Sequence, residues 1–584
     1  MTGVQTCALP IYVSVITEED LQKSGQSTLV EVLRTQPGLE VTSNGGMGAT
    51  SNVFIRGANN NHTVVLVDGI RLSSATLGTT AFENIPVSQI EHIEILRGAG
   101  SSLYGADAVG GVIQIFTKRG EGALRPNLSV GAGSYNTQSA SVGYGGRVND
   151  TSFNLQFGYI GTAGFSAIGN STNSTYNPDS DGYRNNNLTG TVSQTLAPGH
   201  EIGFTLLNSS GFTHFDSGGN TPAANPTHNF DYRLSQNLTE AALYSKNRFT
   251  ANWESLFRIG AGLDHSTSFA PNTTNTITTL SAFRTNQNQA TWQNDINIGP
   301  ALLTLGAEKR IQKVGGSTNY AVNERDVNSA FGQYQQRFDK HKIQLNARND
   351  NNSQFGSRNT GSISYGYQLT SNLRVSATTG TAFNAPTFNQ LYFPGFGNAN
   401  LRPERASSRE ASATYNFGLH RVSVVYYDTS VTDLIVNAGV PLAPSNVNRA
   451  KLNGTTLSYL GDISGNSISA SADFQDPRDE ASGLMLPRRS RQHATLSISR
   501  DVAQWRLGSE LAASTKRYDD AANTKSLGGY GLVNLTASYL VSKEVTLIAR
   551  ANNVFNKQYE LIKDFNTPGA NVFVGLQYQP RRGL

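Results

Sequence analysis

The chain has 584 residues, of which 15% are charged and 58 are glycine, and its formal net charge at pH 7 is +4. A charge so close to balance gives no basis for nucleic-acid binding, and a single cysteine excludes a disulfide framework. No stretch approaches the ~20 apolar residues of a membrane-spanning helix, which excludes helical spans but not spanning strands.

The first segment, residues 1–12, lacks the basic start and long apolar stretch of a secretory signal peptide. We interpret it as foreign to the natural protein or disordered. Residues 17–36 then predict two short helices. Thr17 and Thr28 are placed to cap them, and Pro37 and Gly38 end the second.

Residues 52–118 contain short apolar runs, several of which end in an Arg-Gly or Asp-Gly pair. Each run of about five residues bounded by glycine predicts a short buried strand followed by a tight turn. The runs are 53–57, 64–69, 93–98, 101–105 and 110–115. Together they predict a small mixed sheet, with the glycine-rich polar loops 44–49 and 72–80 at one end of it. A soluble α+β domain is the alternative.

After Arg119 apolar and polar residues alternate in segments of about ten residues, as in 153–159, 494–499 and 533–539. A soluble sandwich alternates too, with its apolar face inward. Here the polar faces carry Asn, Gln and Arg, and long polar loops alternate with turns as short as 542–544. This pattern is typical of a membrane barrel whose apolar face meets lipid.

Lipid forbids an open sheet edge, so the strands must close. We count about 22 strands between residues 126 and 579, enough for a lumen that needs a plug. The predicted fold is an all-β membrane protein: a 22-stranded antiparallel transmembrane β-barrel holding a small N-terminal α+β plug domain. The predicted boundaries are 13–121 for the plug and 122–584 for the barrel.

The run 54–57 and the segments 66–71 and 104–111, in this order, resemble the plug of TonB-dependent outer-membrane receptors. Together with 44–46 they are most similar to the cobalamin receptors of that family. The resemblance implies a monomer in the outer membrane of a Gram-negative bacterium, in contact with lipid and driven by the TonB complex. It also implies a secretion signal and a coupling box ahead of residue 13, neither of which this sequence contains.

Arg56 and Arg97 end two of the predicted plug strands. Guanidinium groups form bidentate, charge-assisted bonds to carboxylates. The hairpin that contains Glu404 and Glu410 resembles a family motif whose acidic residues face the plug. We therefore predict a plug–barrel lock of Arg56 and Arg97 with Glu404 and Glu410; the alternative is four solvated surface charges.

Carboxylates converge in the predicted outer loops. Asp179 and Asp181 lie in one loop, and Asp216 and Asp231 flank the next. Carboxylate oxygens from adjacent loops suit Ca²⁺, although an Asp-x-Asp-Gly spacing alone is usually a turn. The resemblance implies calcium at these four positions, with one further aspartate of the family replaced near 164–166.

The solute site is predicted from the two plug loops and from aromatic residues of an outer loop, which offer large contact area and few rotamers to freeze. For each aromatic residue, a membrane-interface girdle or loop packing is the alternative. The predicted residues are Asn44, Gly45, Gly46, Met47, Leu72, Ser73, Ser74, Thr76, Phe388, Tyr392, Phe393 and Phe396.

No catalytic constellation emerges from the sequence: the nine histidines have no metal-ligand spacing, and there is no Gly-x-Ser-x-Gly elbow. The resemblance implies active uptake of a scarce large solute, a corrinoid first and a ferric siderophore next. The rivals are a passive porin-like channel, an adhesin and a surface hydrolase. A passive channel would not need a plug, and no nucleophile with a nearby base can be assembled.

Overall fold

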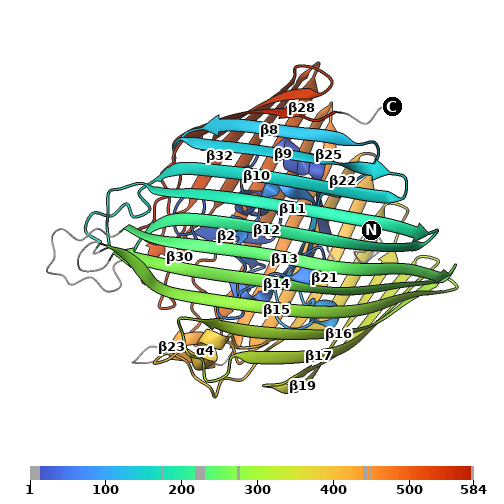
Figure 1. Ribbon diagram of the computed structural model, residues 1–584. Helices are drawn as coiled ribbons and strands as arrows, with labels where there is room; N and C mark the ends of the chain where they lie inside the picture. The colour runs from blue at the N-terminus through green and yellow to red at the C-terminus, as the bar shows by residue number, and fades with distance from the viewer. Residues whose placement is uncertain are drawn as a thin grey trace.

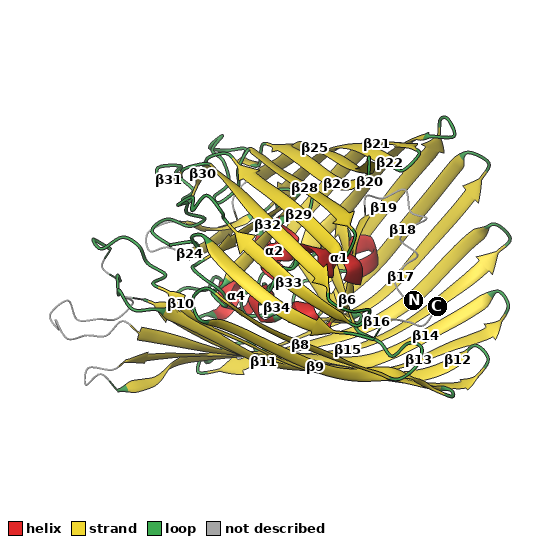
Figure 2. Ribbon diagram, turned by 90° about the horizontal axis from the view of Figure 1, so that it is seen from above, coloured by secondary structure: helices red, strands yellow, loops and turns green. Residues whose placement is uncertain are grey.

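The computed structural model describes residues 13–173, 175–217, 231–271, 276–438, 443–446 and 449–580, so the segment 1–12 lies outside the described residues. Two bodies make up the chain: a cylinder of long strands, and a smaller domain with most of the helices, enclosed by the cylinder (Figures 1 and 2). In the described part of the chain, no helix is long and apolar enough to cross a membrane.

The cylinder is a closed antiparallel barrel of 22 strands, as predicted. It closes where the last strand, β34, pairs with the first, β8. A two-residue strand, β27 (Arg478–Asp479), adds a pairing with β25. The barrel strands are β8 (Arg125–Gly133), β9 (Thr137–Val148), β10 (Thr151–Phe165), β11 (Asp181–Ala197), β12 (His200–Asp216), β13 (Asp231–Thr250), β14 (Trp253–Pro271), β15 (Ile277–Ile298), β16 (Ala301–Gly316), β17 (Glu324–Phe338), β18 (His341–Asn352), β19 (Gly356–Gln368), β20 (Leu373–Asn384), β21 (Glu404–Phe417), β22 (His420–Thr432), β25 (Arg449–Ile463), β26 (Asn466–Gln475), β28 (Gln492–Val502), β29 (Trp505–Ser514), β32 (Tyr530–Leu540), β33 (Val545–Asn552) and β34 (Asn571–Tyr578).

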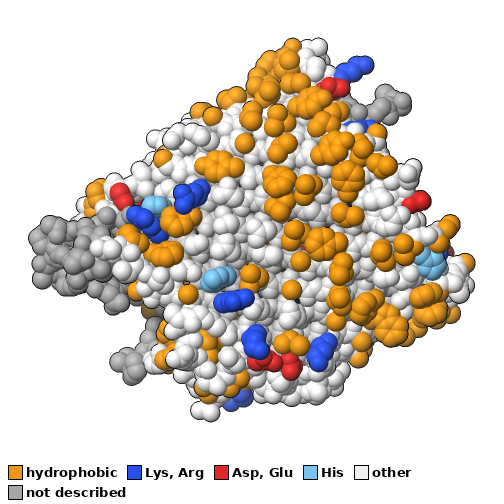
Figure 3. Space-filling model, viewed as in Figure 1, with side chains coloured by type: hydrophobic (Ala, Val, Ile, Leu, Met, Phe, Trp, Pro, Cys, Tyr) orange, Lys and Arg blue, Asp and Glu red, His pale blue; other side chains and the backbone are white. Residues whose placement is uncertain are grey.

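Apolar side chains point outward from this barrel. In β10, Gln156 is 2% exposed and faces the lumen, whereas its neighbour Phe157 is 49% exposed on the outer surface. Figure 3 shows hydrophobic side chains spread across the outer face of the strands. A soluble sandwich would bury this face, whereas an apolar outer face with a polar lumen is the pattern of outer-membrane-type barrels.

The inner domain, the plug, is built on a mixed five-stranded sheet in the order β1-β6-β7-β4-β5, in which only β4 and β7 are parallel. A separate hairpin pairs β2 with β3. The plug elements are β1 (Val13–Thr17), α1 (Glu18–Ser24), α2 (Leu29–Arg34), β2 (Leu39–Ser43), β3 (Ser51–Ile55), η2 (Asn60–His62), β4 (Thr63–Val67), β5 (Ile70–Arg71), η3 (Phe82–Asn84), η4 (Val87–Gln89), β6 (Ile90–Arg97), α3 (Ser101–Tyr104) and β7 (Gly111–Thr117).

Local sequence explains how the plug elements begin and end. The Thr17 side chain accepts a bond from the Asp20 amide in a capping box, and that of Thr28 accepts from Glu31, so both predicted helices are confirmed. Asp68 and Gly69 both have positive φ, which a tight hairpin turn requires and an Asp-Gly pair supplies.

One predicted plug strand is wrong. Residues 101–105 form the short helix α3, in which the Gly105 amide donates to the Ser101 carbonyl at 2.9 Å. Glycines at both ends let the chain turn sharply there, and Gly105 ends the helix with a φ of 79°. An apolar run of this length has no periodicity that separates a strand from one helical turn.

The predicted domain boundary at residue 121 lies in the segment that joins β7 to β8. Outside the barrel wall, the long loops at one end carry elements of their own. These are α4 (Phe388–Tyr392), the hairpin of β23 (Ile435–Ala438) and β24 (Ala443–Asn446), and the hairpin of β30 (Arg517–Tyr518) and β31 (Ser526–Leu527). We call this end the outer end.

Candidate functional site

Arg56 joins the plug to the barrel wall. It follows β3 with a φ of 52°, and this left-handed turn directs its side chain toward β21. Its Nη1 donates to Oε2 of Glu410 at 2.6 Å, and its guanidinium lies 4.7 Å from the centre of the Tyr427 ring. The two charged groups are buried, so the structure brings together one arginine and one glutamate of the predicted lock.

Glu404, at the start of β21, also faces the plug, but its partner there is a histidine. Oε2 of Glu404 lies 2.6 Å from Nε2 of His62, and both side chains are buried. The same carboxylate accepts bonds from the Asn384 side chain at 2.5 Å and the Ile435 amide at 2.7 Å. No sequence motif pointed to His62, which directly precedes the apolar run of β4.

Arg97 bonds to the plug itself. Its Nε donates to the Pro37 carbonyl at 2.7 Å, and its Nη1 donates to Oγ of Ser14 at 2.8 Å. It therefore ties β1 and the segment after α2 to the end of β6. These bonds lie within the plug, whereas the predicted lock placed Arg97 against Glu404 and Glu410.

Two further plug–wall contacts were not predicted. The Glu40 carboxylate, in β2, accepts bonds from the amide and hydroxyl of Ser490 and from the Gln475 side chain. From the wall, Arg489 donates to the Gly57 carbonyl at 3.2 Å and lies 4.3 Å from the centre of the Phe54 ring. A single polar residue in a loop or strand gives no sequence signal that it joins the plug to the barrel wall.

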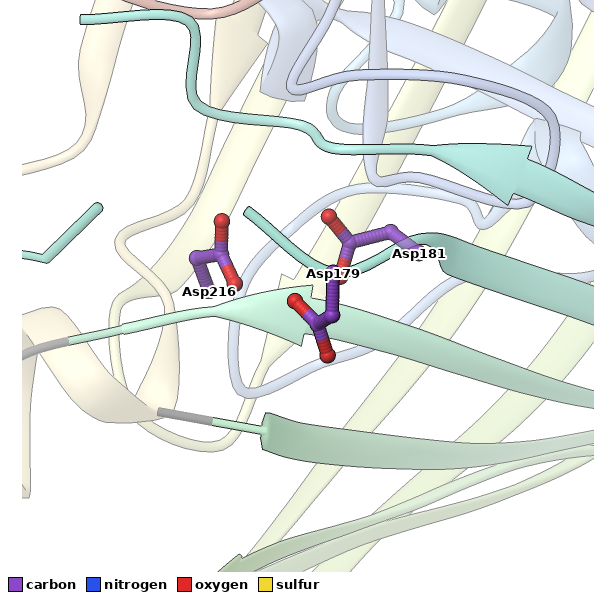
Figure 4. Close-up of side chains that lie close together, drawn as sticks. All are labelled: Asp179, Asp181 and Asp216. Atoms are coloured by element: carbon purple, nitrogen blue, oxygen red, sulfur yellow. The ribbon is translucent and has the colours of Figure 1, made fainter. Parts of the chain in front are cut away.

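Three of the predicted calcium ligands converge at the outer end (Figure 4). Carboxylate oxygens of Asp179, Asp181 and Asp216 lie within 4.8 Å of one another. Asp181 begins β11 and accepts a bond from the Ala167 amide at 2.6 Å, while Asp216 ends β12. Asp231 stands opposite Asp216 in the strand register, but its side chain lies outside the part that the structure describes.

The plug loop 72–80 is clamped by the wall. The Ala75 amide donates to Oγ1 of Thr285 at 2.9 Å, and the Ala75 carbonyl accepts from the Phe388 amide, at the start of α4, at 3.1 Å. Leu72, Ser74 and Thr76 are consequently buried, whereas Leu77 is 56% exposed. The exposed apolar residue of this loop is thus one that the sequence did not single out.

Phe388 does not face a solute in this conformation. Its ring is fully buried and packs with Ala75, Val314, Tyr320 and Tyr392, so that it anchors α4 to the plug loop. The partly exposed aromatic residues are Tyr392, Phe393 and Phe396. In the plug loop 44–49, Gly45 is buried, and the partly exposed residues are Asn44, Gly46 and Met47. In the plug loop 72–80, Ser73 is partly exposed.

Cavities follow one side of the plug, between it and strands β8, β9, β33 and β34. One of ≈ 1060 Å³ opens at the short-turn end and is followed by cavities of ≈ 200 Å³ and ≈ 170 Å³. Gln22 and Lys118 line both the first and the second, and Gln26 and Phe573 line both the second and the third. The third also borders Met47, so these spaces adjoin one another from the short turns to the plug loop 44–49.

Glu83 also borders the third cavity. Its Oε2 accepts a bond from Oγ of Ser51 at 2.5 Å. Burial raises the pKa of this carboxyl to about 7, although the bond from Ser51 opposes the shift. The plug therefore contains a carboxyl group that titrates near neutral pH.

Comparison with known families agrees with this architecture. The model described as the TonB dependent receptor-like β-barrel matches residues 123–554, and that of the TonB-dependent receptor plug domain matches residues 7–112. The chain therefore belongs to the TonB-dependent receptors. These are uptake receptors of the Gram-negative outer membrane that act with TonB, and they are not enzymes.

Individual relatives are similar over almost the whole chain. The vitamin B12 transporter BtuB of Photobacterium profundum is 30% identical over 578 residues, which are 97% of this chain and 92% of the relative. BtuB of Vibrio vulnificus is 28% identical over 579 residues, covering 96% and 90%. The siderophore receptor PirA of Acinetobacter baumannii superposes with a TM-score of 0.84 over 98% of each chain, at 18% identity, which shows the fold alone.

Proposed function

We propose that this receptor imports a corrinoid of the vitamin B12 type. The observation that carries the proposal is the 30% identity to a vitamin B12 transporter over 97% of the chain. The siderophore receptors that share the fold are only 16–19% identical, so the sequence similarity favours the solute class of the vitamin B12 transporters. A ferric siderophore is the second candidate, since receptors for siderophores share this fold.

The solute binds at the outer end, against the plug loops and the aromatic residues beside α4. Leu77, Tyr392 and Phe393 offer apolar area, and the polar groups of Asn44 and Ser73 orient the solute by hydrogen bonds. A corrinoid combines a large flat apolar ring with amide side chains, which suits this mixture of surfaces.

Calcium orders the outer loops in this proposal. Oxygen ligands lie 2.3–2.6 Å from Ca²⁺, so two oxygens on opposite sides of one ion are about 5 Å apart. The 4.8 Å spread among Asp179, Asp181 and Asp216 fits that limit. Three carboxylates this close repel one another unless a cation or protons balance them. Bound calcium would supply that charge and join the loop before β11 to the end of β12.

Transport needs a path past the plug, because the plug fills the lumen. We place this path along β8, β9 and β34, where the row of cavities leads from loop 44–49 to the short-turn mouth. The wall there offers small side chains such as Ser129 and Ser141. On the plug side, α1 and the segment after it border the row of cavities. Both directly follow β1, which is the edge strand of the plug sheet. TonB then supplies the force that widens the path.

The test is a binding measurement on the purified receptor in detergent, with calcium present. Cyanocobalamin, cobinamide and a panel of ferric siderophores are compared by isothermal titration calorimetry. We expect the corrinoids to bind with a dissociation constant below about 1 μM, since a scarce solute needs tight capture. Binding of a siderophore together with no heat from either corrinoid would overturn the proposal.

A further inference from the structure

A small cavity lies between the plug loop 72–80 and the barrel wall. Its volume is ≈ 40 Å³, and Arg71, Asp107, Arg310 and Arg325 are among its lining residues. Thr387, which caps α4, also borders it. A space of this size holds about two or three waters, or one small ion with a water.

Arg310 brings a buried guanidinium group to this cavity. It lies in β16 and is 3% exposed. Among the described residues, its Nε and Nη1 have no hydrogen-bond partner. Burial, together with repulsion from Arg310, lowers the pKa of Arg71 to about 10. A buried guanidinium group with unbonded N–H donors destabilises the fold unless a bound water or ion accepts hydrogen bonds from those donors.

The other two arginines that line the cavity have partners in the chain. Nη1 of Arg71 donates to the Ala106 carbonyl at 2.9 Å and to Oδ2 of Asp107 at 3.2 Å. Nη2 of Arg325 donates to the Pro386 carbonyl at 2.7 Å. These bonds fix the two side chains, and both residues line the cavity.

The charged side chains around the small cavity carry more positive than negative charge. Beside the cavity, Arg348 pairs with Glu308 at 3.1 Å and with Asp350 at 2.8 Å. In the described structure, the cavity and this adjoining cluster hold four guanidinium groups, and their carboxylates are those of Asp107, Glu308 and Asp350. Four positive charges against three negative ones leave one positive charge.

We propose that this cavity binds one monovalent inorganic anion, of which chloride is the representative. One negative charge balances the surplus, and the volume admits a monatomic ion but no organic solute. Bound there, the anion joins Arg71 of the plug to Arg310 and Arg325 of the wall. It thereby holds the base of the solute-contacting loop, whichever solute that loop receives.

The direct test uses the unaltered receptor. Crystals are grown with sodium bromide in place of sodium chloride, and diffraction is measured at the bromine absorption edge. We expect an anomalous peak between the guanidinium groups of Arg310 and Arg71 that persists at 50 mM bromide. A cavity without this peak, when other bromide sites are visible, would overturn the proposal.

A second test measures linkage in solution. Thermal unfolding is followed in sodium chloride and in sodium gluconate at equal ionic strength, since an anion that binds only the folded state raises the unfolding midpoint. We expect chloride to raise the midpoint by about 2 °C or more in the wild type and to have no effect in Arg310→Gln.

The matched control is Lys309→Gln, which removes one positive charge from the exposed outer face of the same strand. This variant should keep the full response to chloride. An equal response in the wild type, Arg310→Gln and Lys309→Gln would reveal a general salt effect and would exclude a site at Arg310.

Discussion

Nη1 of Arg56 in the plug lies 2.6 Å from Oε2 of Glu410 in the barrel wall, and the two side chains are 5% and 9% exposed. A buried pair of this kind is costly to break, because removing one partner strands the other charge away from water. We therefore expect the pair to fasten the plug to the barrel wall.

Removing either partner should loosen the plug. We expect Arg56→Gln and Glu410→Gln each to weaken plug retention by about 3 kcal/mol. Passive leakage of small solutes, measured as antibiotic sensitivity of cells or as conductance in planar bilayers, should rise in each. The double variant should leak less than the sum of the single effects, because the stranded charge is then gone. Arg402→Gln, in an exposed outer-loop pair, is the control and should not leak. Equal leakage in all variants would refute the fastening.

Arg97 should behave differently from Arg56. Because its bonds go to Pro37 and Ser14, Arg97→Gln should free β1 and raise hydrogen exchange at residues 13–17. Hydrogen exchange measured by mass spectrometry distinguishes this local loosening from detachment of the whole plug. Slow exchange in β1 combined with high leakage would instead place Arg97 in the lock with the wall.

The aspartate cluster predicts a calcium effect on solute affinity. Chelation by EGTA should weaken corrinoid binding at least about tenfold, because the outer loops then lose their cross-link. Asp181→Asn combined with Asp216→Asn should bind as weakly with calcium as the wild type binds without it. Asp501→Asn, which changes an exposed carboxylate near the end of β28 at the opposite end of the barrel, should respond to EGTA as the wild type does. Affinity that is independent of calcium would remove the ion from the proposal.

Glu83 predicts that plug stability depends on pH. Between its ordinary pKa of 4.5 and about 7, the folded plug keeps a proton that the unfolded chain has released. This contribution to stability is complete below pH 4.5 and is lost as the pH rises through 7. The midpoint of thermal unfolding should accordingly fall between pH 5 and pH 8. Glu83→Gln should reduce that fall, whereas Glu480→Gln, at an exposed outer-loop position, should leave it unchanged.

If the solute passes along the row of cavities, a large side chain introduced there should block transport. Ser141→Trp would fill the cavity beside β9, so uptake should fall at least about tenfold while affinity at the outer end stays unchanged. Ser412→Trp places the same side chain on the lumen face of β21, across the barrel, and should transport normally. Uptake of radiolabelled cyanocobalamin by cells, set against surface binding, separates the two steps. Normal uptake by Ser141→Trp would show that the path runs elsewhere.

By itself, the sequence determined the architecture of this protein. Alternation in segments such as 153–159 sets which face meets lipid, and lipid in turn demands closure. The apolar runs and their Gly-containing turns predicted three strands of the plug sheet, β4, β6 and β7, and the strand β3, which pairs with β2 in a separate hairpin. They did not mark β1, β2 or β5, and at 101–105 one helical turn and a short strand share the same pattern. The resemblance to TonB-dependent receptors singled out Arg56, Glu410 and the three clustered aspartates, because each lies at a recognisable position relative to a motif of that family.

Only the tertiary structure decided which lumen residues meet the plug. His62 and Glu404 are 342 residues apart, and they face each other only because closure of 22 strands sets the angle of each strand around the plug. A lumen side chain has the same alternating pattern whether it contacts water or the plug, as Glu410 does. Burial of Phe388 and exposure of Leu77 depend likewise on how loops from separate strands pack, which local sequence does not encode.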